Sequence, residues 1–239
     1  MLRKIKQALP FSLRKNIKLK YAQLKQKQWE IKHANSPKIF GIGYNKTGTT
    51  SLEKAMRNLG YKVGDQRTAE LLHKEWGVRN FTPIIKYCKT AEFFQDVPFS
   101  KPFTFIALDQ AFPNSKFILT IRDDPEQWYN SLIKFHTKLW SHNDKPPTPR
   151  DLKNAKYVYK GWAWELNRLQ SATPENNPYD KKSLINSYNE YNKSVIDYFK
   201  NKNENLLVLN VAEKGVYCKL CEFLNQPVTR EEFPWENKT

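Results

Sequence analysis

The pattern of hydrophobic and polar positions predicts short buried strands that alternate with amphipathic helices. Three apolar runs have the length of a buried strand, at the start of the segment 38–52, at 116–121 and at 206–211. An apolar face at helical spacing follows the first run: Leu52, Ala55, Met56 and Leu59. Such alternation is typical of an α/β domain built on a parallel sheet.

The remainder of the chain continues this alternation. We expect a short strand at 61–63, and further helices in these ranges: 68–76, 103–112, 151–170, 183–199 and 216–224. Loops rich in proline and asparagine separate some of them, at 143–150 and 173–178. The stretch that leads to 93–98 shows no clear period, and no element is predicted there.

A loop rich in glycine and threonine follows the first strand. It leads directly into a predicted helix, whose N-terminal amides and dipole would attract an anion. Gly43 and Gly48 have the spacing of the two glycines of a P-loop, but Thr49 stands where a P-loop has lysine. Lys46, inside the loop, is the displaced cation.

The position of this lysine separates two kinds of enzyme chemistry. A P-loop phosphotransferase needs the lysine after the second glycine and a carboxylate that holds Mg²⁺. A strand-end carboxylate exists at Asp123, but it follows Arg122. A phosphotransferase with a relocated lysine, dependent on magnesium, is therefore one alternative.

A second strand carries a candidate anion ligand at its carboxyl end. Arg122 directly follows the apolar run 116–121, at the edge where ligands of open α/β sheets bind. Asp124 suits the N-cap of the next helix, Pro125 its first position, and Gln127 the capping box. The planar guanidinium of Arg122 can meet a phosphate with two hydrogen bonds.

Charge is concentrated at the N-terminus. Of a net charge of +16, residues 1–36 supply ten Lys or Arg against one Glu, a net of +9. We expect a basic helical arm at 1–36, interrupted at Pro10, and a single domain at 37–239. Such an arm could contact an anionic membrane surface, a polyanionic substrate or nucleic acid, although a plain solvated helix has the same pattern. A nucleic-acid-binding protein is the third alternative, but the chain contains no recognised nucleic-acid motif.

The cysteines predict neither a disulfide framework nor a metal site. There are three, and Cys218 and Cys221 form a C-x-x-C on a predicted helix without a second pair. Reduced thiols in a cytoplasmic protein are the expectation. No apolar run approaches the roughly 20 residues of a membrane span.

The run Lys46-Thr47-Gly48-Thr49-Thr50-Ser51-Leu52 after a strand closely resembles the 5′-phosphosulfate loop of the sulfotransferases. Further landmarks at 108–113, 117–132, 206–211 and 223–224 extend the resemblance over residues 38–235, to a bacterial-type branch of the P-loop sulfotransferases. It implies a P-loop NTPase-like, three-layer α/β/α domain with a central parallel sheet of about four or five strands and helical insertions. It also implies 3′-phosphoadenosine 5′-phosphosulfate (PAPS) as co-substrate and no required metal.

The resemblance assigns roles to residues of this chain. The 5′-phosphosulfate would be bound by the loop residues Asn45, Lys46, Thr47, Gly48, Thr49, Thr50 and Ser51. Lys46 would also neutralise charge on the leaving phosphate oxygen, and Arg122 with Ser131 would bind the 3′-phosphate. The gap from Arg122 to Ser131 is one residue longer than usual, so Asn130 is the alternative to Ser131.

In-line sulfuryl transfer also requires a general base within hydrogen-bond reach of the acceptor. Asp96 is the first candidate, because Asp96-Val97-Pro98 lies where cytosolic sulfotransferases place a catalytic His before an apolar residue and Pro. Burial would raise its pKa toward neutrality. His136 is the second candidate, and Asp65 and Glu75 stay open. The sequence thus predicts a sulfotransferase that acts on a hydroxyl or amine of a glycan or small molecule, its acceptor and oligomeric state unknown.

Overall fold

The computed structural model describes residues 11–170 and 172–234, and the chain divides into two compact units at Ser36/Pro37. The first unit contains the helix α2 (Phe11–His33). The ring of Trp29 stacks on that of His33, with centroids 4.3 Å apart, and the Trp29 carbonyl contacts His33 Nδ1 at 2.9 Å. The interruption expected at Pro10 lies outside the described residues.

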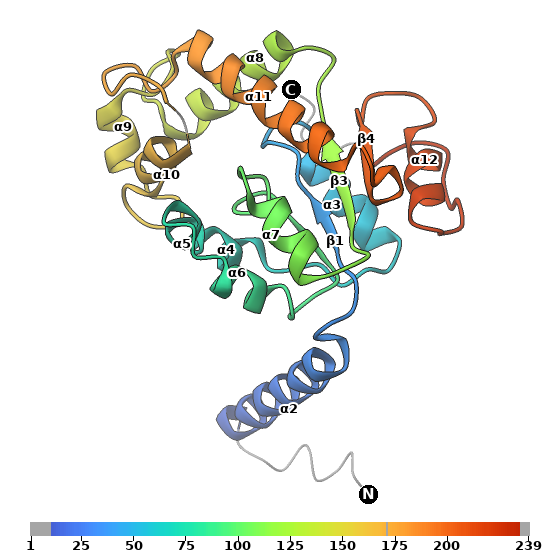
Figure 1. Ribbon diagram of the computed structural model, residues 1–239. Coiled ribbons are helices and arrows are strands. Elements are labelled where there is room, and N and C mark those ends of the chain that lie inside the picture. Colours follow the sequence, from blue (N-terminus) through green and yellow to red (C-terminus); the bar gives the residue numbers. More distant parts are fainter. Residues whose placement is uncertain (1–10, 171, 235–239) are drawn as a thin grey trace, which may run out of the picture. The chain divides into compact units, whose positions relative to one another are not determined.

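The second unit contains a four-stranded parallel sheet in the order β2-β1-β3-β4, of which β1, β3 and β4 are labelled in Figure 1. Its strands are β1 (Ile39–Gly41), β2 (Phe93–Gln95), β3 (Lys116–Thr120) and β4 (Leu206–Leu209). In register, Phe40 pairs with Phe94 on one side and with Phe117 on the other. Because all four strands are parallel, their carboxyl ends share one edge, where the loop 42–48 and Arg122 lie. The α/β fold expected from the sequence is confirmed.

Alternate residues of the strands face two separate hydrophobic cores. Phe40 and Phe117 belong to the core that also contains apolar side chains of α7 (Thr104–Ala111) and α11 (Lys181–Phe199). Ile39 and Ile118 belong to the other core, with side chains of α3 (Thr49–Asn58) and α12 (Val216–Phe223). The sheet is therefore covered by helices on both faces, which gives three layers.

Most predicted elements are present, and the remaining helices complete the fold: α4 (Gln66–Glu70), α5 (His73–Gly77), α6 (Thr82–Tyr87), α8 (Pro125–Trp140), α9 (Pro149–Asn154) and α10 (Trp162–Gln170). A 3₁₀ turn at Asn203–Asn205 precedes β4. The prediction of a strand at 61–63 is wrong, since only Val63 in this range forms a β-bridge, which pairs it with Phe93. The strand β2 and the helix α6 were missed because elements of three and six residues are too short to show a period.

Two predicted helices are broken in the structure. The range 68–76 is divided between α4 and α5, and α4 begins at Gln66 because the Asp65 side chain caps it, accepting from the Thr68 amide at 2.8 Å. The range 151–170 is divided between α9 and α10. Gly161, with a φ of +89°, closes the intervening loop by donating to the Ala155 carbonyl at 3.0 Å.

Candidate active site

The loop after β1 is held at its backbone by side chains from distant elements. Arg122 Nε donates to the Lys46 carbonyl at 2.7 Å, and Trp128 Nε1 donates to the Asn45 carbonyl at 3.0 Å. At the start of the loop, the Tyr191 hydroxyl donates to the Ile42 carbonyl at 2.7 Å. These three bonds fix the path of the loop relative to β3, α8 and α11, and they place Arg122 directly against it.

The two glycines of the loop are required for different reasons. A Cβ at Gly43 would lie 2.0 Å from Thr120 Oγ1 and 2.5 Å from the Thr120 carbonyl, so the loop passes too close to β3 for any side chain. Gly48 has a φ of +101°, and a Cβ there would lie 2.4 Å from Val211 Cγ2. Gly48 is also the N-cap of α3, and no side chain caps this helix. The first amides of α3 are therefore oriented for an anion.

All but one of the loop residues predicted to bind the donor line the same pocket. Asn45, Lys46, Gly48, Thr49, Thr50 and Ser51 line one pocket. Thr47 does not: its side chain is fully buried, donates to the Tyr44 carbonyl and contacts Thr120 Oγ1 at 2.6 Å. Thr47 thus ties the loop to β3, while its neighbours face the pocket.

Lys46 and Arg122 place two cations at this end of the pocket. Lys46 has a φ of +70°, and its ammonium lies 3.9 Å from the centre of the Phe135 ring on α8. Burial lowers the pKa of Lys46, and the neighbouring Arg122 lowers it further. Burial also lowers the pKa of Arg122. Desolvated and mutually repelling cations favour a bound anion.

The helix α8 begins as predicted, with Asp124 as N-cap and Pro125 at the first position. The Asp124 side chain accepts from the Gln127 amide at 2.7 Å, but the Gln127 side chain accepts from the Asp123 amide at 3.2 Å, one residue before the N-cap. The capping box expected from the sequence is thus displaced by one residue. Asp123 and Asp124 both lie before the first helical residue, Pro125.

Neither candidate for the second 3′-phosphate ligand lines the pocket. Ser131 Oγ is buried and, within the described part of the chain, has no hydrogen-bond partner. Asn130 is exposed on the surface of α8. The structure therefore brings together Arg122 and the loop, and it leaves Ser131 and Asn130 outside the lining of the pocket.

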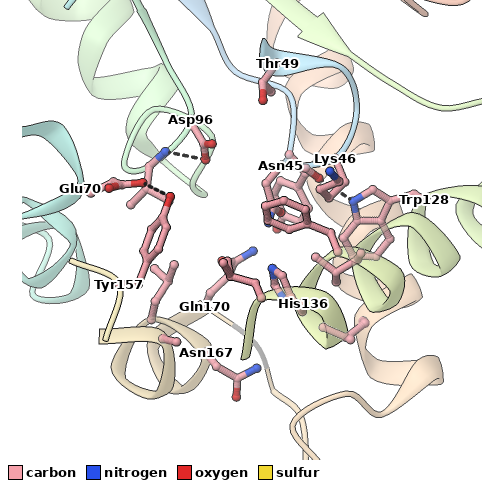
Figure 2. A pocket seen from close by; sticks show the side chains of 18 of the residues that line it. Asn45, Lys46, Thr49, Glu70, Asp96, Trp128, His136, Tyr157, Asn167 and Gln170 are labelled. Atoms are coloured by element: carbon pink, nitrogen blue, oxygen red, sulfur yellow. Dashed lines mark hydrogen bonds between the residues drawn. The ribbon is translucent and has the colours of Figure 1, made fainter. Parts of the chain in front are cut away.

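Asp96 lies on the opposite side of the pocket from Lys46 (Figure 2). It directly follows β2 and has a φ of +62°. One carboxylate oxygen accepts from the Val97 amide at 2.9 Å, and the other accepts from Gln66 Nε2 at 3.2 Å. Burial raises the pKa of Asp96, while the nearby Lys101 lowers it. An oriented carboxylate with a raised pKa is suited to accept a proton.

His136 also lines the pocket, from α8. Its Nδ1 contacts the Tyr179 hydroxyl at 2.9 Å, and its ring centre lies 4.4 Å from that of Trp140. Burial, helped by Lys46 and Lys101, lowers the pKa of His136 to about 3. Its imidazole is therefore neutral at physiological pH and a weak proton acceptor.

The other two acidic candidates lie away from the pocket lining. Asp65 is exposed and caps α4, accepting from Thr68 at its amide and hydroxyl. Glu75 accepts from Asn80 Nδ2 at 2.7 Å. Both carboxylates already have structural partners in their own turns.

Two charged residues of the pocket were missed in the sequence. Glu70 is 2% exposed, accepts from the Tyr157 hydroxyl at 3.2 Å and pairs with Arg67 at 2.8 Å; burial raises its pKa. Lys101 is 1% exposed, and burial lowers its pKa to about 8. No local pattern marks either residue, because helix and turn positions with such side chains are usually exposed.

The pocket has a volume of about 310 Å³. Away from the loop its walls are largely apolar and come from α8, α10, the start of α11 and the connecting segments: Leu132, Phe135, Leu139, Trp140, Tyr157, Trp162, Leu166, Tyr179 and Leu184. Asn167 and Gln170 of α10 add two amides (Figure 2). The pocket thus joins a cationic end at the sheet edge to a mainly aromatic end within the helical insertion.

A family model described as "Sulfotransferase domain" matches residues 38–239. The chain therefore belongs to the sulfotransferase family, which confirms the resemblance drawn from the loop and the Arg122 strand. The comparison with curated proteins gives no match for this chain. As a member of this family the protein is a transferase, and the pocket described above is its candidate active site.

Metal-binding clusters and membrane-spanning helices are both absent from the part of the chain that the structure describes. No group of three or more His, Cys, Asp or Glu in residues 11–170 and 172–234 could hold a metal ion. Cys88, Cys218 and Cys221 are free thiols. Over the same residues, no helix combines the length and the apolar character needed to cross a membrane.

Proposed function

We propose that the protein transfers a sulfuryl group from PAPS to a hydroxyl or amine acceptor. The observation that carries the proposal is the bond from Arg122 Nε to the Lys46 carbonyl at 2.7 Å. It sets a guanidinium at the end of β3 against a lysine-bearing loop at the end of β1. Two separate anionic groups of one donor match this pair of cations.

The residues present fit such a donor. The N-terminal amides of α3, with Thr49, Thr50 and Ser51 at the pocket, would hold the 5′-phosphosulfate. Arg122 would hold the 3′-phosphate through its terminal nitrogens, since its Nε is already bonded to the loop. Thr47 acts through the shape of the loop.

The chemistry follows from the two sides of the pocket. The acceptor oxygen or nitrogen forms a bond to sulfur while the bond from sulfur to the 5′-phosphate oxygen breaks. Asp96 takes the proton of the acceptor, and the electron pair of the broken bond leaves on the phosphate oxygen. Lys46 neutralises the charge that develops there.

Asp96 is better suited to the role of base than His136. The Asp96 carboxylate has a pKa raised by burial, whereas burial lowers the pKa of His136 to about 3. A base with a pKa closer to the working pH transfers protons more effectively. We assign His136 to the wall of the acceptor site, where its bond with Tyr179 positions α8 against the segment that precedes α11.

The acceptor is a glycan or a small molecule whose ring contacts the aromatic end of the pocket. Flat apolar side chains can pack against a sugar ring or against an aromatic ring. The basic helix α2 would contribute a peripheral contact with an anionic membrane surface or another polyanion, since its lysines are exposed.

Binding of adenosine 3′,5′-bisphosphate, measured by calorimetry and thermal shift, tests the donor. We expect tight binding without metal, weakened in Arg122→Ala and lost in Lys46→Ala. ATP with magnesium should stabilise the protein much less, and equal stabilisation by both ligands would favour a phosphotransferase. A screen of hydroxylated and amine acceptors with ³⁵S-labelled PAPS then tests the transfer itself.

A further inference from the structure

Lys101 presents a buried ammonium to the pocket that the proposed reaction does not use. It lies in the turn between β2 and α7, and its side chain is almost completely removed from water. A buried charge is costly unless a group of opposite charge compensates it. Lys101 therefore needs a carboxylate in its surroundings.

The turn brings Lys101 and Asp96 into the same wall of the pocket. The Ser100 amide donates to the Asp96 carbonyl at 2.8 Å, and the Lys101 amide donates to the Pro98 carbonyl at 3.2 Å. Both side chains then line the pocket. The Lys101 ammonium donates to Gln170 Oε1 and lies 5.5 Å from the centre of the Tyr44 ring. Gln170 orients this ammonium but is neutral and cannot compensate its charge.

The other carboxylates near this wall already have cationic partners. Glu70 pairs with Arg67 at 2.8 Å, and Glu53 pairs with Arg57 at 2.8 Å. Asp96 forms no ion pair within 4.0 Å in the described part of the chain. Asp96 and Lys101 are thus the carboxylate and the ammonium of this wall that are left to compensate each other.

We propose that Lys101 is a positioning residue that keeps the Asp96 carboxylate ionised when the donor is bound. The proposal rests on the proposed function, because it takes Asp96 as the base. A bound donor would bring several negative charges to the pocket, and these would favour the protonated form of Asp96. Lys46 and Arg122 would be engaged by the donor, so Lys101 is the cation that remains on the acceptor side.

The electrostatic effects on the two groups agree with this assignment. Burial raises the pKa of Asp96, and the charge of Lys101 is the strongest influence that lowers it. Burial lowers the pKa of Lys101, and the charge of Asp96 raises it. Other charged or titratable groups also face the pair. They come from the loop after β1 (Tyr44, Lys46), the end of β3 (Arg122), α3 (Glu53), α4 (Glu70), α8 (His136) and the segment before α10 (Tyr157). Lys101 is charged below its pKa of about 8, and Asp96 is charged above its own raised pKa.

Carbon-13 NMR of protein labelled at the aspartate carboxyl carbons measures the pairing directly. Asp96→Asn assigns the signal, and the titration midpoint of Asp96 is compared between the wild type and Lys101→Met, with and without adenosine 3′,5′-bisphosphate. We expect the midpoint to rise by about one pH unit or more in Lys101→Met. Lys134→Met, which removes an exposed lysine of α8, is the matched control and should leave the midpoint unchanged.

An unchanged midpoint in Lys101→Met overturns the proposal. If that variant does not fold, the wild type decides, since the Asp96 signal should show a second, smaller step near pH 8 as Lys101 loses its proton. Absence of that step also overturns it. In the acceptor assay, the acid limb of kcat/KM should move with the Asp96 midpoint, whereas a merely structural role would lower the rate equally at all pH values.

The experiment separates this proposal from the proposed function. Failure of the bisphosphate to bind the wild type would contradict the donor assignment, while the Asp96 titration in the free protein would still report the pairing. Tight bisphosphate binding with an unmoved Asp96 midpoint would contradict the role of Lys101 alone.

Discussion

The loop after β1 and the turn after β2 lie at the same edge of the sheet but are held in different ways. The first, at 42–48, is fixed through its backbone carbonyls by Arg122, Trp128 and Tyr191. The second, at 96–103, turns on its own backbone bonds and places charged side chains that interact with α4 and α10. One region supplies a rigid cradle of amides, and the other supplies side chains whose charge state depends on their neighbours.

This difference predicts how each region responds to substitution. Changes in the first loop should act through backbone geometry and through the binding of anions. Changes in the second turn should act through protonation, with little effect on donor binding. Substitutions in and around the two regions test this division, and the loss of the proposed base should have the largest effect.

Asp96→Asn should reduce kcat for sulfuryl transfer by about 10²–10⁴-fold, because it removes the proposed base. The amide keeps the size of the side chain, and the affinity for adenosine 3′,5′-bisphosphate should stay within about twofold. Transfer from ³⁵S-labelled PAPS to the best acceptor of the screen measures the rate, and calorimetry measures the affinity. A large loss of bisphosphate affinity would contradict the division between the two regions.

Lys46→Met should reduce kcat by about 10²–10³-fold, because charge on the leaving oxygen would lose its cation. Unlike Asp96→Asn, this substitution should also strongly reduce the affinity for adenosine 3′,5′-bisphosphate. Lys138→Met, near the end of α8, is a control that removes an exposed lysine outside the pocket lining. Equal effects of the two methionine variants would show that only net charge matters.

Gly48→Ala should lower the free energy of unfolding by about 2–4 kcal/mol, since strain at positive φ adds to a steric clash. Gly60→Ala provides the comparison, because Gly60 has a φ of +89° but no atom within 4 Å of the position that a Cβ would take. That variant should lose only about 1–2 kcal/mol, the cost of the backbone conformation. Urea denaturation measures both. Similar losses would mean that the contact with Val211 relaxes at little cost.

His136 should make the protein less stable in acid. Its folded pKa is about 3, against a usual value of 6.5, so the unfolded chain binds the proton first as the pH falls. The stability due to neutral His136 is therefore full above pH 6.5 and is lost progressively as the pH falls toward 3, by as much as about 3 kcal/mol at pH 4. Urea denaturation from about pH 7 to about pH 4 should show a shallower decline in His136→Gln. An identical decline would contradict the buried, neutral assignment.

Ser131→Ala should have the smallest effect. Its hydroxyl is buried without a partner among the described residues and lies outside the lining of the pocket. Bisphosphate affinity should fall less than about fivefold, and the free energy of unfolding should change by less than about 1 kcal/mol. A loss as large as that of Arg122→Ala would mean that α8 moves when the donor binds and brings Ser131 to the 3′-phosphate.

The sequence was informative where local chemistry decides the conformation. Lys46, Gly48 and Arg122 could be predicted as neighbours because each follows a strand of a parallel sheet, and carboxyl ends of such strands meet at one edge. The start of α8 could be predicted from Asp124 and Pro125, because the preferences for the N-cap and the first helical position are local. Asp96 was identified only by resemblance to sulfotransferases.

The sequence was uninformative where packing between distant segments decides. Glu70 and Lys101 are ordinary surface residue types, and they are buried because distant segments pack against them. Tyr157 packs against Glu70, and Gln170 and Tyr44 pack against Lys101. The break between α9 and α10 was hidden by apolar residues that continue a helical pattern across 155–161. There a closing backbone bond at Gly161 overrides the local preference.

The amino-acid sequence alone was enough to predict the alternation of strands and helices, the glycine-containing loop after β1 and the position of Arg122. The first two follow from local dihedral preferences, and the position of Arg122 follows from its place at the end of a parallel strand. Which charges are buried together was settled by the folding of the chain in three dimensions. The energy of a buried charge depends on every neighbouring group, and those neighbours here come from segments as far apart in the chain as Asp96, His136 and Gln170. Protonation at the site is therefore a property of the folded pocket.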